Sequence, residues 1–135
     1  MGVGIVGPAG VTTTTPPAKE LLTKIAKIEV ADGTTGFAAF GLPQGAFIAG
    51  VYTISMGANA TQNINAGFSA AGTELINAFA PNSTGYAVSG AATGSAVGTV
   101  LTSDKTVFVR ANVGALTNPV YVKVEYYFPQ SGMTF

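Results

Sequence analysis

The sequence contains no cysteine, no histidine and no tryptophan. Without cysteine there is neither a disulfide scaffold nor a thiol nucleophile. Without histidine there is no imidazole for acid–base catalysis, and nearly every zinc or haem site also loses its usual ligands. These absences exclude most enzyme classes, so we expect a protein without enzymatic activity, cofactor or metal.

Charge is also scarce, because six basic and six acidic residues make up only 9% of the chain and cancel to a net charge of zero. An ordinary soluble domain is roughly 25% charged. The basic patch that binds nucleic acid or an anionic membrane is therefore missing. No apolar run approaches the about 20 residues of a membrane-spanning helix. We expect neither nucleic acid nor a membrane as a partner.

Small and β-branched residues dominate what is present. Valine and isoleucine together number 21 against 6 leucines, and alanine, glycine and threonine supply 56 of the 135 residues. β-branched side chains suit pleated sheets, whereas helices favour leucine and other unbranched residues. The composition therefore favours an all-β protein.

The middle of the chain, residues 33–103, has a single charged side chain, that of Glu74. Free monomers normally mix both signs of charge over their surface and keep their net charge away from zero. We infer that another subunit covers much of this surface, as in a homo-oligomer. The alternative is a monomer solvated by Asn, Ser, Thr and Gln side chains.

Residues 1–24 are interpreted as an extended N-terminal arm with a possible short helix at its end. Residues 1–17 are uncharged, contain three prolines and four consecutive threonines, and show no regular periodicity. Residues 18–24 have room for two helical turns, with Glu20 four positions before Lys24. The apolar run of the arm is short and interrupted by glycine and proline, unlike a secretory signal.

Residues 25–135 are interpreted as one antiparallel β-sandwich domain. Strands are predicted at residues 25–30, 36–40, 46–56, 63–69, 86–88, 97–102, 106–113 and 120–128. Short strands separated by Gly, Pro, Asn and Asp turns, without helical patterns between them, are typical of a sandwich or barrel. We expect a jelly-roll-like sandwich in which residues 46–56 form a central strand and residues 114–119 close a final hairpin.

Several local motifs have ordinary structural interpretations. The pattern GxGxxG at residues 2–7 follows no strand and is broken at once by Pro8, so it does not predict a dinucleotide site. The two glycosylation tripeptides, at Asn59 and Asn82, are interpreted as turns. Asp32 and Asp104 also lie in predicted turns, where an aspartate bonds its own backbone.

Aromatic side chains are the best candidates for binding a partner. Phe108, Tyr121 and Tyr127 are predicted to share the outer face of the final hairpin, together with the polar residues Arg110, Lys123 and Glu125. Interface cores are rich in aromatics and poor in charge, so we favour a protein interface there over a sugar site. The arm adds further candidate contacts, because extended chain can pair with the edge of a partner's sheet. These are Val3, Ile5, Val6 and Val11.

Four segments together carry a family resemblance. They are LPQGAFI at residues 42–48, AGFS at residues 66–69, LTSDKTV at residues 101–107 and the closing Val-x-Val-x-Tyr strand. The order and the sequences of these segments resemble those of small virion structural proteins of tailed bacteriophages. Capsid decoration or cement proteins are the nearest match.

This resemblance implies a jelly-roll-like sandwich, often a trimer, that binds the outer capsid surface without enzymatic activity or cofactor. Its partners would be the major capsid protein or other virion subunits. The protein would be made in the host cytoplasm without a signal peptide and end up at the capsid surface. The alternative is a tail, baseplate or fibre-associated module that binds a host glycan or another virion protein.

Overall fold

The protein is described by a computed structural model that covers residues 20–59, 61–81, 85–88 and 93–129. Eight strands and one short 3-10 helix account for most of these residues. In chain order they are β1 (Leu22–Ile28), η1 (Val30–Asp32), β2 (Phe37–Leu42), β3 (Phe47–Ser55), β4 (Asn63–Gly67), β5 (Ile76–Phe79), β6 (Gly85–Val88), β7 (Lys105–Asn112) and β8 (Val120–Tyr127). No helix in the described ranges is long and apolar enough to span a membrane.

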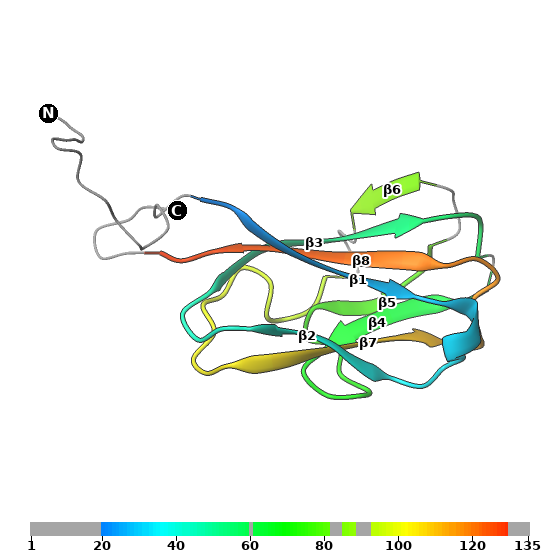
Figure 1. Cartoon of the computed structure of the whole chain (residues 1–135), viewed down its shortest axis with the longest axis horizontal. Coiled ribbons are helices and arrows are strands. Elements are labelled where there is room, and N and C mark those ends of the chain that lie inside the picture. The colour runs from blue at the N-terminus through cyan, green and yellow to red at the C-terminus, as the bar shows by residue number, and fades with distance from the viewer. Residues whose placement is uncertain (1–19, 60, 82–84, 89–92, 130–135) are drawn as a thin grey trace, which may run out of the picture.

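The strands form two antiparallel sheets that pack face to face (Figure 1). The strand order is β1-β8-β3-β6 in the first sheet and β2-β7-β4-β5 in the second. The pairs are nested, because β1 pairs with β8, β2 with β7, β3 with β6 and β4 with β5. An eight-stranded double sheet wound in this way is a jelly roll, which confirms the predicted fold class.

The core lies between the sheets and is built from alternate residues of the strands. In β8, Val120, Val122 and Val124 are fully buried, whereas the residues between them are partly exposed. Successive side chains of a strand point to opposite faces, so this alternation places one face of β8 in the core. Leu75 and Ile76 are fully buried and anchor the segment after β4 in the same core.

The central strand β3 changes its phase at a β-bulge. Its register with β8 shifts between Ile48 and Gly50, because one extra residue lies in β3 at that point. Ile48 before the bulge and Val51 after it are therefore both buried, and Tyr52 faces outward. The bulge therefore divides the strand predicted at residues 46–56 into two segments whose buried residues alternate in different phase.

The helix predicted at residues 18–24 is also wrong in the part that the structure describes. Leu22 already belongs to β1 and is paired with Tyr126 of β8. An isolated helix of two turns is unstable in water, whereas a strand added to a sheet gains a ladder of backbone hydrogen bonds. Residues 1–19, with most of the predicted arm, lie outside the described residues.

Two further expectations are corrected near the end of the chain. Residues 97–102 form turns and a single bridge from Val100 to Phe47, where a strand was predicted. Residues 114–119 do not close a hairpin, because β7 and β8 belong to different sheets. They cross from one sheet to the other. Alternating burial predicts that β7 and β8 are strands, but it does not tell which neighbour each strand pairs with.

Asn59 holds three loops together at one end of the sandwich. Its side chain is fully buried, and its Oδ1 accepts the N–H groups of Thr117 at 2.8 Å and Asn118 at 2.9 Å. Its own N–H donates to the carbonyl of Pro81 at 3.1 Å. A side chain enclosed in this way is not open to glycosylation, in agreement with the interpretation of this tripeptide as a turn.

Candidate interaction surface

The outer face of the first sheet carries a cluster of aromatic side chains. Tyr121 and Tyr127 occupy the partly exposed positions of β8 that alternate with its buried valines. Phe47 is paired with Tyr127, and the two ring centroids lie 5.2 Å apart. Tyr52 and Ile54 face the same way, because they are paired with Lys123 and Tyr121. We call this surface the aromatic face and define it by Phe47, Tyr52, Ile54, Tyr121 and Tyr127.

Tyr52 lies flat against its own strand. A Cβ atom placed on Gly50 would come within 2.8 Å of the Tyr52 hydroxyl oxygen, so the ring occupies the space that a larger residue would need. The bulge that precedes Gly50 turns this ring outward. Tyr52 could not be predicted, since the bulge leaves no mark in the alternation of apolar residues. Phe47 was missed because its pairing with Tyr127 joins strands that are distant in the sequence.

The charges on the aromatic face are neutralised within it. Lys123 Nζ lies 3.2 Å from Glu125 Oε2 and 4.9 Å from the centre of the Tyr52 ring. The two side chains are only 21% and 19% exposed. On the neighbouring strand, Lys27 Nζ lies 5.6 Å from the centre of the Tyr121 ring. Cations above aromatic rings are held by the ring quadrupole, so this face presents stacked rings and few free charges.

Phe108 does not share this face with the two tyrosines, contrary to the prediction. It lies on β7, in the second sheet, together with Arg110. The predicted polar face is divided in the same way, because Arg110 is on the second sheet while Lys123 and Glu125 are on the first. Within the described ranges, Arg110 Nε is buried without a hydrogen-bond partner.

The chain itself covers part of the outer face around Phe108. A Cβ on Gly67, which is paired with Phe108, would meet the Glu74 carboxylate. Glu74 Oε1 accepts the N–H of Phe68 at 2.9 Å and so holds the loop after β4 in place. The same loop reaches across to β2, because a Cβ on Gly36 would meet the backbone of Ala70. The chain's own loop therefore covers part of the outer face of the second sheet.

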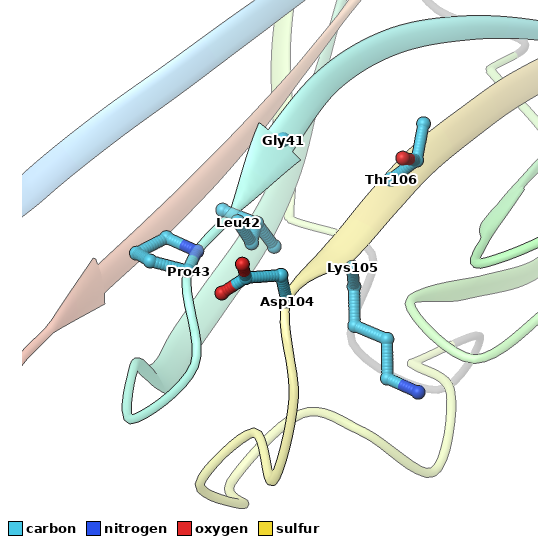
Figure 2. Close-up of a pocket in the computed structure, with 6 residues that line it drawn as sticks. All are labelled: Gly41, Leu42, Pro43, Asp104, Lys105 and Thr106. Atoms are coloured by element: carbon cyan, nitrogen blue, oxygen red, sulfur yellow. The ribbon is translucent and has the colours of Figure 1, made fainter.

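A shallow hollow at the end of the second sheet is the remaining candidate (Figure 2). It is lined by Gly41, Leu42, Pro43, Asp104, Lys105 and Thr106. Asp104 Oδ1 accepts the N–H of Gln44 at 2.8 Å, and Lys105 Nζ points away from that carboxylate toward the Phe68 ring, at 5.4 Å. Both charged groups thus have structural partners. Asp104 stabilises the distant turn at residues 43–46, whereas the sequence predicted that it would bond its own backbone.

The other predicted contacts, Val3, Ile5, Val6 and Val11, lie outside the described residues. Among the residues that the structure covers, no group of three His, Cys, Asp or Glu side chains is placed to hold a metal ion. The described surface therefore offers a contact area built from aromatic rings.

Comparison with solved structures gives one informative similarity. The fold matches a chain from a structure described as the cyanophage Pam1 capsid asymmetric unit, with a TM-score of 0.58 and 22% sequence identity. The match covers 92% of this chain and 98% of that chain. No family model matches the sequence, and no curated protein is similar to it. At this level of identity the similarity shows a shared fold, a sandwich of two antiparallel sheets.

Proposed function

We propose that this chain is a non-enzymatic virion structural protein that decorates or cements a phage capsid by bridging shell subunits. The observation that carries the proposal is the extent of the structural match, which covers 92% of this chain and 98% of a chain in a phage capsid. The matched protein is thus a small subunit of nearly the same length. The sequence resemblance to decoration and cement proteins supports the same role.

The mechanism is passive binding. A protein that contacts two or more shell subunits at once stabilises the joined state, because its binding free energy is lost when those subunits separate. An oligomer, for which we propose a trimer, adds avidity by linking several such contacts. The proposed partners are the major capsid protein or other virion subunits, and the proposed location is the capsid surface.

The aromatic face is the proposed contact area for the shell. Rigid aromatic rings supply large contact areas in protein interfaces, whose centres are poor in free charge. The internal pairing of Lys123 with Glu125 removes charges that would otherwise have to be desolvated singly. Tyr121 and Tyr127 are therefore the leading contact residues. Phe108 lies on the opposite sheet, so its substitution tests whether that sheet makes the contact instead.

A glycan-binding module of a tail, baseplate or fibre is the alternative. The observation that favours it is the same set of partly exposed rings, since aromatic rings also stack against sugars. The two functions differ in their ligand, and purified components distinguish them.

Co-sedimentation of purified protein with capsids that lack it tests the proposal. We expect binding that Tyr121→Ser and Tyr127→Ser each weaken by about 30-fold, because truncating a central interface aromatic costs about 2 kcal/mol. Val113→Ser, at an exposed valine away from this face, is the control and should bind normally. Phe108→Ser weakening the binding while both tyrosine variants bind fully would assign the contact to the other sheet. Specific glycan binding without capsid binding would support the alternative.

A further inference from the structure

The free edge of β1 is a second feature suited to binding. β1 is the first strand in the order β1-β8-β3-β6, so among the described residues it is paired on one side only. Its register with β8 runs without a shift from Leu22 opposite Tyr126 to Ile28 opposite Val120. A strand edge presents unpaired N–H and C=O groups and is a template for another strand.

The other three edge strands of the sandwich are shorter or less regular than β1 and are therefore less suited to the addition of another strand. β2 has a register shift between Ala38 and Phe40. β5 and β6 have only four residues each, and β5 is also shifted against its partner. Short or bulged edges resist strand addition. β1 has seven residues and no shift, which makes it the most regular edge in the described part of the chain.

The exposed residues of β1 show which part of its edge is accessible to another strand. Thr23, Lys24 and Ile25 are exposed in succession, and Ile25 is 53% exposed. Lys24 lies opposite the buried Val124 and yet is itself exposed, so the second sheet does not cover β1 here. A strand added at this edge would shield Ile25 from water.

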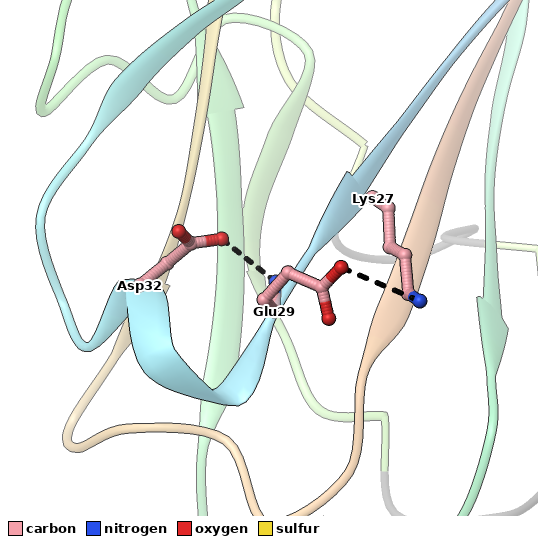
Figure 3. A network of polar contacts seen from close by, with 3 residues as sticks. All are labelled: Lys27, Glu29 and Asp32. Carbon is pink, nitrogen blue, oxygen red and sulfur yellow. Dashed lines mark hydrogen bonds and ion pairs between the residues drawn. The ribbon is translucent and has the colours of Figure 1, made fainter.

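The far end of β1 is closed by its own turn (Figure 3). Lys27 Nζ lies 3.4 Å from Glu29 Oε2, and the Glu29 N–H donates to Asp32 Oδ2 at 2.7 Å. These contacts fix η1 directly after the strand. The accessible stretch of the edge is therefore residues 22–26.

The chain contains a segment whose chemistry fits this edge. Residues 11–15 read Val-Thr-Thr-Thr-Thr, five consecutive β-branched residues without charge. Such residues have the highest strand propensity, and a neutral strand allows Lys24 and Lys27 to remain in solvent. In strand addition, backbone hydrogen bonds supply most of the affinity.

The prolines that follow favour pairing between copies. Pro16 and Pro17 stand directly after the β-branched run. Proline fixes its own φ and keeps the preceding residue extended, so residues 15–17 are expected to continue straight instead of reversing onto their own β1. Residues 16–21 join this run to β1, and six extended residues span about 20 Å, enough to reach the edge of an adjacent copy.

We propose that the free edge of β1, at residues 22–26, receives residues 11–15 of a second copy of this chain as an added β-strand. Each copy then donates one strand to a neighbouring copy and accepts one strand from another, so that every copy in the oligomer is joined to the next. This inference rests on the proposed oligomeric role, but its test needs no capsid.

Disulfide cross-linking tests the pairing, because the sequence is free of cysteine. One copy carries a cysteine at one of residues 12–15 in turn, and a second copy with a different tag carries Thr23→Cys. Disulfides form only where two Cα atoms approach within about 7 Å. We expect mixed dimers from at least one arm position, in roughly tenfold excess over a partner copy that carries Val113→Cys.

Double variants separate pairing between copies from pairing within one chain. A double variant with both cysteines that cross-links only within single chains would overturn the proposal, as would a chain that stays monomeric. An oligomer without any mixed dimers would also overturn it, because the copies would then associate elsewhere. Thr13→Pro should abolish the cross-link while Thr13→Val preserves it, since proline removes the backbone donor that a strand needs.

Discussion

At the scale of single residues, buried or partly buried polar side chains fix loops that the sheets alone would not hold. Asn59 accepts two backbone N–H groups from residues that lie nearly 60 positions further along the chain. Glu74, the single charge in residues 33–103, is used in the same way, because its carboxylate holds the loop after β4. Its role is therefore structural.

Asn59→Ala should be among the most destabilising single substitutions in the described part of the protein. It removes the acceptor of two partly buried hydrogen bonds, from the N–H groups of Thr117 and Asn118, and each lost hydrogen bond costs about 0.5–1.5 kcal/mol. We expect a loss of about 1–3 kcal/mol in the free energy of unfolding, measured by urea denaturation. Asn77→Ala, at an exposed position of β5, is the control and should change stability by less than about 0.5 kcal/mol. Equal effects of the two variants would contradict this account of Asn59.

Sequence analysis could not identify these residues, although it located most of the strands. Burial and alternation are local properties, so they are visible in β8, where every second residue is buried. Hydrogen bonds such as those of Asn59 join distant loops and leave no local pattern. Tyr52 was missed for a related reason, because the bulge in β3 is seen only in its pairing with β8.

At the scale of whole elements, the main difference between expectation and structure is the partner of each strand. β7 and β8 are consecutive strands, and a short polar connection between two such strands normally predicts a hairpin. In this jelly roll, all consecutive strands except β4 and β5 lie in opposite sheets, so Phe108 is separated from Tyr121 and Tyr127. The sequence therefore identifies aromatic residues as candidate contacts, but it does not predict which of them share a surface, because that depends on the strand topology.

Removal of residues 1–17 should leave the β domain folded but weaken its assembly. The described strands form two complete sheets and a buried core without the arm, so thermal unfolding should stay cooperative. Self-association and capsid binding should both fall, because an extended arm that adds to a partner's sheet contributes backbone hydrogen bonds. Calorimetry and light scattering measure the two effects. Loss of cooperative melting in the truncated protein would show instead that the arm is part of the protein's own core.

At the scale of the whole molecule, the described features combine into a small sandwich without a metal cluster in its described part, with one aromatic face and one open sheet edge. The neutral chain lacks the density of basic residues that produces a steep salt dependence in nucleic-acid binding. The mode of action that we propose is contact with other subunits. Its proposed effect on a capsid is therefore thermodynamic, a shift of the equilibrium toward the assembled shell.

The most direct test is the opening temperature of capsids assembled with and without this chain. We predict that capsids without it form normally but open at a lower temperature, and that adding the purified protein restores their resistance, because a ligand of the joined state stabilises that state. Capsid opening is followed by the access of a fluorescent dye to the packaged DNA. Equal opening temperatures in all three samples, with the protein bound at full occupancy, would contradict the cementing role.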